Sequence, residues 1–216
     1  MRIDSVEVAR LILAGQAPPE DWIPHITELR LERSYITDLR PVSLLTGLRT
    51  LLLTRSRISD IAPLAALTRL QRLHLSFTAV SDLAPLAGML ELEGCFLTGS
   101  LVEEIAPLAG LTSLERLDLG DTRITDATPL MGLHNLHSLD LSGTRITDIA
   151  PLAALTALQF LDLTGTPVTD LTPLSKLTNL RWLIMRNTSA DVSLQSQLAG
   201  CHVITAVQAP RRRARR

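Results

Sequence analysis

Three aspartates recur at an interval of 22 residues, and their carboxylates are the clearest candidates for chemistry in this chain. They are Asp118, Asp140 and Asp162, with Asp121 close to the first of them. Carboxylates held in a row repel one another and could bind a hard cation such as calcium. Calcium, however, prefers about six to eight converging oxygens, and a straight row does not converge. We therefore predict an acidic stripe that helps to select a partner, and no metal site.

Catalysis would require a nucleophile hydrogen-bonded to a base, and the sequence does not place such a pair. His74 and Asp118 lie two intervals apart with Phe96 between them, and the other histidines are isolated. There is no glycine-rich phosphate loop, no dinucleotide fingerprint and no pattern of zinc ligands. An open surface also cannot exclude water as an active site must. We predict no enzyme activity, no cofactor and no small-molecule substrate.

The interval of 22 residues runs through the whole chain and defines the elements that carry these side chains. Eight prolines follow it: Pro19, Pro41, Pro63, Pro85, Pro107, Pro129, Pro151 and Pro173. A fixed period of about 20–29 residues is typical of a solenoid, in which each repeat packs on its neighbours. Hydrophobic residues make up 46% of the chain and aromatic residues only 3%, which fits an aliphatic solenoid core.

Each repeat contains one short strand and one turn that begins near the proline. Leucines ten and twelve places after a proline, as in Leu117-Asp118-Leu119, alternate inward and outward as a strand does. Such strands must lie parallel, about 4.8 Å apart. Proline is suited to the first turn of a short helix, because its missing N–H is not needed there.

Two sets of polar residues, each at one fixed place of the repeat and therefore forming a column in the stack, have structural interpretations. An acidic residue three places before most of the prolines should accept the backbone N–H groups that open the turn. A hydroxyl stands fifteen places after every proline and should bond backbone groups that a tight coil leaves unpaired. The acidic column is Asp38, Asp60, Asp82, Glu104, Asp126, Asp148 and Asp170, and the hydroxyl column is Ser34, Ser56, Thr78, Ser100, Thr122, Thr144, Thr166 and Thr188.

The full repeat resembles the 22-residue leucine-rich repeat of bacterial internalins. One copy reads Leu136-x-x-Leu139-x-Leu141-x-x-Thr144-x-Ile146-x-Asp148-Ile149-x-Pro151-Leu152-x-x-Leu155-Thr156. The family usually has asparagine where this chain has serine or threonine. The resemblance implies an α/β solenoid: a right-handed, curved coil with a parallel β-sheet on the concave face and short 3₁₀ turns on the convex face. It also implies that the chain binds another protein.

The sequence predicts one elongated domain with capped ends. Residues 1–18 should form a helical N-terminal cap assisted by Trp22, and residues 19–190 eight repeats. Residues 191–209 should form a C-terminal cap, with a short helix over 192–199 and a ninth strand within 201–207. The motif Leu198-x-x-Cys201-x-Val203 suggests that the last repeat is four residues shorter. Residues 210–216 should form a disordered basic tail.

Charge and cysteine content limit the cellular compartment and the kind of partner that we predict. The net charge is −1, and the five arginines of residues 211–216 leave −6 on the rest, unlike a dedicated nucleic-acid binder. Cys95 and Cys201 belong to repeats too far apart for a disulfide, which fits a reducing compartment. With no secretory signal and no apolar run long enough to span a bilayer, we predict a cytoplasmic protein.

Side chains that leave the concave face should lie nine, eleven, thirteen and fourteen places after each proline, and most aromatic residues fall there. The predicted partner-binding residues are Phe77, Phe96, Arg72, Arg116, Asp118, Asp140, Phe160, Asp162, Trp182, Ile184 and Arg186. Phe160 and Trp182 occupy one column on adjacent strands, so their rings should touch. Alternatively, the C-terminal cap covers this patch.

The fourth repeat departs from the others. Gly94 and Gly99 should leave the sheet bare beside Phe96, with Arg72 and Arg116 on either side. This predicts a shallow notch for an acidic or aromatic side chain. Alternatively, the glycines are neutral sequence variation in a repeat that tolerates it.

We therefore predict a monomeric protein-interaction scaffold that binds through its concave face. Two alternatives remain. One is an exported effector or host-surface binder that uses a route without a signal sequence. The other is a nucleic-acid-associated protein that uses the arginine tail, whose binding should fall steeply with salt.

Overall fold

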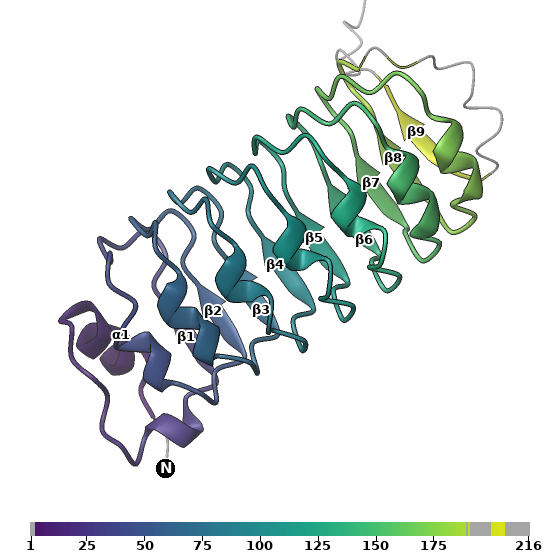
Figure 1. Cartoon of the computed structure of the whole chain (residues 1–216). Coiled ribbons are helices and arrows are strands. Elements are labelled where there is room, and N and C mark those ends of the chain that lie inside the picture. The colour runs from purple at the N-terminus through teal and green to yellow at the C-terminus, as the bar shows by residue number, and fades with distance from the viewer. Residues whose placement is uncertain (1–2, 189, 191–199, 206–216) are drawn as a thin grey trace, which may run out of the picture.

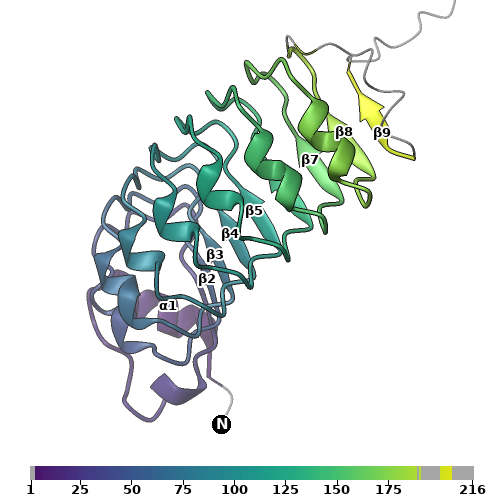
Figure 2. The same ribbon diagram turned by 45° about the vertical axis from the view of Figure 1, so that its right-hand side comes forward.

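The chain forms a curved solenoid whose strands build a single parallel sheet along one face (Figures 1 and 2). The computed structural model describes residues 3–188, 190 and 200–205. Nine strands follow one another in chain order across the sheet. They are β1 (Glu28–Arg30), β2 (Thr50–Leu52), β3 (Arg72–His74), β4 (Gly94–Phe96), β5 (Arg116–Asp118), β6 (Ser138–Asp140), β7 (Phe160–Asp162), β8 (Trp182–Ile184) and β9 (His202–Ile204).

Short 3₁₀ helices line the opposite face (Figure 1). They are η1 (Ile23–His25), η2 (Val42–Leu44), η3 (Ala62–Ala66), η4 (Ala84–Leu86), η5 (Ala106–Leu108), η6 (Thr128–Leu130), η7 (Ala150–Ala154) and η8 (Thr172–Lys176). From η3 onward the repeat proline lies in the first turn, as predicted. In the first repeat the helix uses Pro24 instead of Pro19. The predicted concave sheet with convex 3₁₀ turns is confirmed.

The leucine columns form one continuous core because every coil repeats in register. From β1 to β8 each strand pairs with the same positions of the next repeat, as Leu117 does with Leu139, and the middle residue of each of these strands is buried. The step to β9 differs, because Leu183 pairs with Val203, whereas a full interval would have paired it with Thr205. The last repeat is therefore shortened by two positions, and the predicted shortening by four is wrong. A slip of two positions leaves the same side chains on the same face, so the hydrophobic pattern could not distinguish the registers.

The two polar columns bond the backbone as expected. All six aspartates of the acidic column, at positions 38, 60, 82, 126, 148 and 170, accept the backbone N–H two residues later at 2.8–2.9 Å. Six hydroxyls donate to the carbonyl oxygen three residues earlier at 2.6–3.1 Å. Ser56 and Ser100 are the exceptions, since their buried hydroxyls have no partner among the described residues. Each bond of the hydroxyl column, which is buried or partly buried, contributes about 1 kcal/mol.

The ends of the solenoid are built differently. Helix α1 (Ser5–Leu13) begins after Asp4, whose carboxylate accepts the N–H of Val6, and it buries Val8 and Ile12 against the first coil. At the other end β9 supplies the ninth strand predicted within residues 201–207. The predicted capping helix over 192–199 and the predicted tail over 210–216 lie outside the described residues.

The two cysteines lie far apart along the sheet, one in β4 and the other beside β9. Both are free thiols, and Cys95 is buried in the core, where burial raises its pKa to about 12. In the part of the chain that the structure describes, none of the helices combines the length and the apolar character that crossing a membrane requires.

Candidate functional site

The concave surface consists of the side chains that point outward from the nine strands. The nine-column (nine places after each proline) contains Arg72, Arg116, Phe160 and Trp182 at the first position of β3, β5, β7 and β8. The eleven-column (eleven places after each proline, the last position of each strand) contains Phe96, Asp118, Asp140, Asp162 and Ile184 in β4 to β8. Phe77 and Arg186 lie just beyond β3 and β8. None of these eleven predicted binding residues is fully buried, so the surface is open to solvent.

An aromatic pair lies on β3 and β4 of the concave face. The ring of Phe96 stacks on His74 with centroids 4.2 Å apart and planes 14° from parallel. Burial of His74 lowers the pKa of its imidazole, with a smaller opposing effect of Glu32. Sequence reasoning missed this pair, although the two residues occupy the same place in consecutive repeats and lie opposite each other.

Phe77, just beyond β3, has an unusual backbone conformation. Its φ angle is 57°, in the left-handed region that bulky residues rarely adopt. Its ring lies between the guanidinium of Arg55, 4.9 Å from the ring centroid, and the backbone of Gly99. The side chain is nonetheless 48% exposed. The ring therefore remains available on the surface while its position is defined from two sides.

The structure has a notch at Gly94 between Arg72 and Arg116, and it is small. A Cβ added at Gly94 would lie 3.1 Å from Cε2 of Phe96, so the phenyl ring itself covers this glycine. The remaining cavity between Arg72 and Arg116 has a volume of about 30 Å³, against several hundred for a ligand pocket. Glu93 and Glu115 also line it and offset the two cations. The sequence does not specify the direction of the Phe96 ring, so the small size of the notch could not be predicted, and its contact with a partner side chain stays a prediction.

The aspartate row lies next to the aromatic pair and is fixed by the backbone. Asp118, Asp140 and Asp162 are consecutive register partners, and each accepts the N–H two residues later at 2.8–3.0 Å. Burial raises the pKa of Asp140, hydrogen bonds from the side chain and the backbone of Ser142 oppose this increase, and repulsion by the other two carboxylates adds to it. Within the described residues no group of three or more His, Cys, Asp or Glu side chains could hold a metal ion.

Replacing Asp140 by asparagine should raise the melting temperature at pH 7 by up to about 3 °C. A folded-state pKa above the unfolded value means that the ionised carboxylate destabilises the fold. The effect is below about 1 kcal/mol for a partly exposed charge, and 1 kcal/mol corresponds to about 2–4 °C here. The gain should disappear as the pH falls below about 3.9, where Asp140 is protonated in both states.

Thermal melts of Asp140→Asn between about pH 3 and pH 8 measure this effect, with Asp126→Asn as the control. Hydrogen bonds from Thr128 lower the pKa of Asp126, so its replacement should lower stability at pH 7. Equal shifts of the same sign in both variants would contradict the assignment.

A second aromatic pair lies at the C-terminal end of the sheet. Trp182 stacks on His202 of β9, with centroids 4.7 Å apart and planes 28° from parallel. Phe160 is the register partner of Trp182, but the stacked ring pairs of the described residues do not include these two. The ring that stacks on Trp182 therefore comes from β9, and the contact with Phe160 stays a prediction. Trp182 remains 46% exposed. β9 therefore does not enclose it, and the rest of the predicted cap lies outside the described residues.

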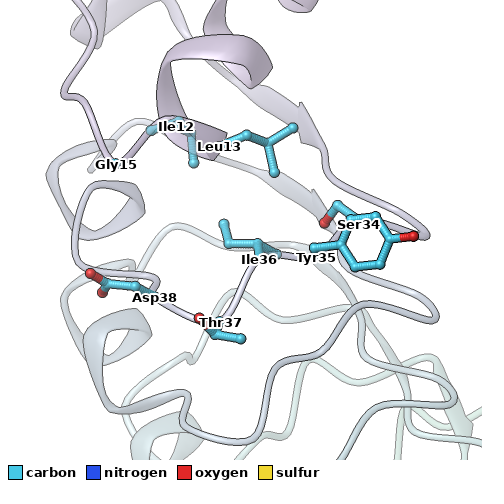
Figure 3. A pocket seen from close by; sticks show the side chains of 8 residues that line it. All are labelled: Ile12, Leu13, Gly15, Ser34, Tyr35, Ile36, Thr37 and Asp38. Atoms are coloured by element: carbon cyan, nitrogen blue, oxygen red, sulfur yellow. The ribbon is translucent and has the colours of Figure 1, made fainter.

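Sequence reasoning also missed a pocket of about 380 Å³ between α1 and the first coil (Figure 3). Ile12 and Leu13 of α1 face Tyr35 and Ile36 across it. Tyr35 is 77% exposed, and the guanidinium of Arg57 lies 4.6 Å from its ring centroid. The lining is mostly apolar and holds no pair of groups suited to acid–base chemistry.

Comparisons with known proteins agree with this architecture. A model of two leucine-rich repeats matches residues 134–176, and a model of one leucine-rich repeat matches residues 110–127. The crystal structure of an internalin C2 from Listeria monocytogenes is 27% identical in sequence. It superposes with a TM-score of 0.84 over 92% of this chain and 92% of its own. The chain thus has a leucine-rich-repeat fold and is similar to internalins.

Other solved structures share the fold of this internalin-like protein. An internalin (inlF) from Listeria monocytogenes is 25% identical with a TM-score of 0.73, and the match covers 92% of this chain but 66% of that one. The ectodomain of a plant membrane receptor kinase from Arabidopsis thaliana is 14% identical with a TM-score of 0.73, over 87% of this chain and 25% of its own. No curated protein sequence gives a significant match. The leucine-rich-repeat fold commonly mediates protein–protein interaction and typically serves as a non-enzymatic scaffold.

Proposed function

We propose that this internalin-like protein is a non-enzymatic, monomeric scaffold that binds a protein partner through its concave face. The observation that carries the proposal is the exposure of aromatic side chains on that face. Phe77 is 48% exposed and Trp182 is 46% exposed, although most leucines of the described residues are buried. Exposed aromatic anchors beside arginine are typical of interface hot spots.

The architecture supports the proposal energetically. Every strand pairs with the next, so the outward side chains are already held in place before a partner arrives. A preformed surface loses little conformational entropy on binding, which leaves more of the contact energy as affinity. A similar solenoid, the plant receptor ectodomain, was crystallised in complex with CASPARIAN STRIP INTEGRITY FACTOR 2.

A pull-down that compares three forms of the protein tests this function. The forms are wild type, Phe160→Ala/Trp182→Ala, and the control Leu90→Ala/Met131→Ala. The control removes two exposed apolar side chains (61% and 47% exposed) that lie outside the sheet. We expect proteins captured by wild type and by the control to be lost from the concave-face variant, because truncating an interface anchor costs about 2 kcal/mol or more.

Two outcomes would contradict the proposal. In the first, the concave-face variant captures the same proteins while its melting temperature falls by many degrees, which would make these rings structural. In the second, capture disappears when residues 211–216 are deleted and declines steeply with salt, which would assign binding to the arginine tail.

A further inference from the structure

The eleven-column places apolar and acidic side chains in a defined order along the sheet. In register from β2 to β9 it contains Leu52, His74, Phe96, Asp118, Asp140, Asp162, Ile184 and Ile204. All eight side chains are partly exposed. The column therefore presents three carboxylates between an aromatic group and an aliphatic group, all open to the same side.

The carboxylates in the middle of this column lack a cation of their own. None of the four ion pairs among the described residues includes Asp118, Asp140 or Asp162. In each of them Oδ1 accepts the backbone N–H two residues later, and no hydrogen bond within the described part of the chain uses Oδ2. Their mutual repulsion contributes to the raised pKa of Asp140. A positive group placed over the row would remove this repulsion.

We propose that the eleven-column binds a partner segment in which arginine or lysine lies between apolar side chains. This rests on the proposed function and names the chemistry of the partner. The basic side chain lies over the aspartate row, and the apolar side chains contact Phe96 with His74 on one side and Ile184 on the other. Adjacent carboxylates about 4.8 Å apart suit the several donors of a guanidinium, which can bridge two of them.

The geometry sets the length of the segment. Phe96 and Ile184 are four strand spacings apart, or about 19 Å. An extended chain covers that distance with about six residues, and a helix with about thirteen. A single segment of a partner protein can therefore contact both apolar groups and the row between them.

The test is the selection of binding peptides from a phage-displayed random library on three forms of the full chain. Each peptide is about 16 residues long, so that either an extended or a helical segment can span the column. They are wild type, the row variant Asp118→Asn/Asp140→Asn/Asp162→Asn, and the control variant Asp126→Asn/Asp148→Asn/Asp170→Asn. Asparagine keeps the Oδ1 acceptor, so the hydrogen bond to the backbone is preserved at all six positions. The control removes the same charge in the same region, from the aspartates that open the convex turns.

We expect peptides enriched on wild type to carry arginine or lysine flanked by aromatic or aliphatic residues. An enriched synthetic peptide should bind the row variant at least about tenfold more weakly, and the control variant as tightly as wild type. Its affinity for wild type should also fall with increasing salt. Deleting residues 211–216 should leave its affinity unchanged.

The other outcomes separate the two proposals. Peptides that bind wild type and the row variant equally, but lose affinity for Phe160→Ala/Trp182→Ala, would overturn the basic-segment inference while supporting the concave face as the binding surface. Peptides that bind all of these variants equally would overturn both. Binding that appears only after residues 211–216 are removed would mean that this chain's own arginines occupy the row, and the proposed partner would be wrong.

Discussion

Replacing Leu139 by alanine should lower the melting temperature by about 6–12 °C. Leu139 is fully buried in β6, between Leu117 of β5 and Leu161 of β7. A buried leucine-to-alanine change costs about 3 kcal/mol through lost burial and the cavity left behind, and 1 kcal/mol corresponds to about 2–4 °C in a chain of this size. Thermal unfolding followed by circular dichroism measures the shift.

The solenoid architecture also predicts which strands Leu139→Ala destabilises. Because each coil contacts only its neighbours, hydrogen exchange should accelerate in β5 to β7 and change little in β1. Leu90→Ala, which truncates a side chain that is 61% exposed, is the matched control and should leave both readouts nearly unchanged. Uniform acceleration along the whole chain after Leu139→Ala would contradict this account.

Replacing Gly99 by alanine should destabilise the fold by about 2–3 kcal/mol. Gly99 has φ of +64°, which costs an L-residue about 1–2 kcal/mol. In addition, the new Cβ would lie 2.7 Å from Cδ1 of Phe77, so the aromatic ring must leave its place below Arg55. Urea unfolding measures the change in the free energy of unfolding.

The variant Gly165→Ala separates the backbone cost of a positive φ angle from the clash with the Phe77 ring. Gly165 has a similar φ of +69°, but an added Cβ would have no neighbour closer than 3.9 Å. It should therefore show only the backbone cost of about 1–2 kcal/mol. Phe77→Ala combined with Gly99→Ala should recover the excess cost of the Gly99 change. If the two glycine variants are equally stable, the Phe77 ring does not press on Gly99 in solution.

The fold could be predicted from the sequence because every coil repeats the same local information. The position of each proline, each leucine column and the aspartate before each turn is confirmed in nearly every coil. The register of β9 was mispredicted, because a shift of two positions preserves the buried face.

The candidate site could be predicted in its columns but not in its contacts. The eleven predicted residues lie on the sheet face or just beyond its strands, since the constant repeat length determines the column of each side chain. The contacts depend on rotamers: Phe96 lies over Gly94, and Trp182 stacks on His202. The pocket beside Tyr35 depends on how α1 docks on the first coil, and that region does not follow the repeat.

The constant pairing interval from β1 to β8 also has an evolutionary consequence. Recombination that gains or loses one whole repeat keeps all the remaining strands aligned, so the core tolerates the event. Gaining a unit such as residues 119–140 would add a fourth carboxylate and move the apolar groups about 4.8 Å further apart. The preferred ligand could thus change in length and charge through copy number alone, without any point mutation.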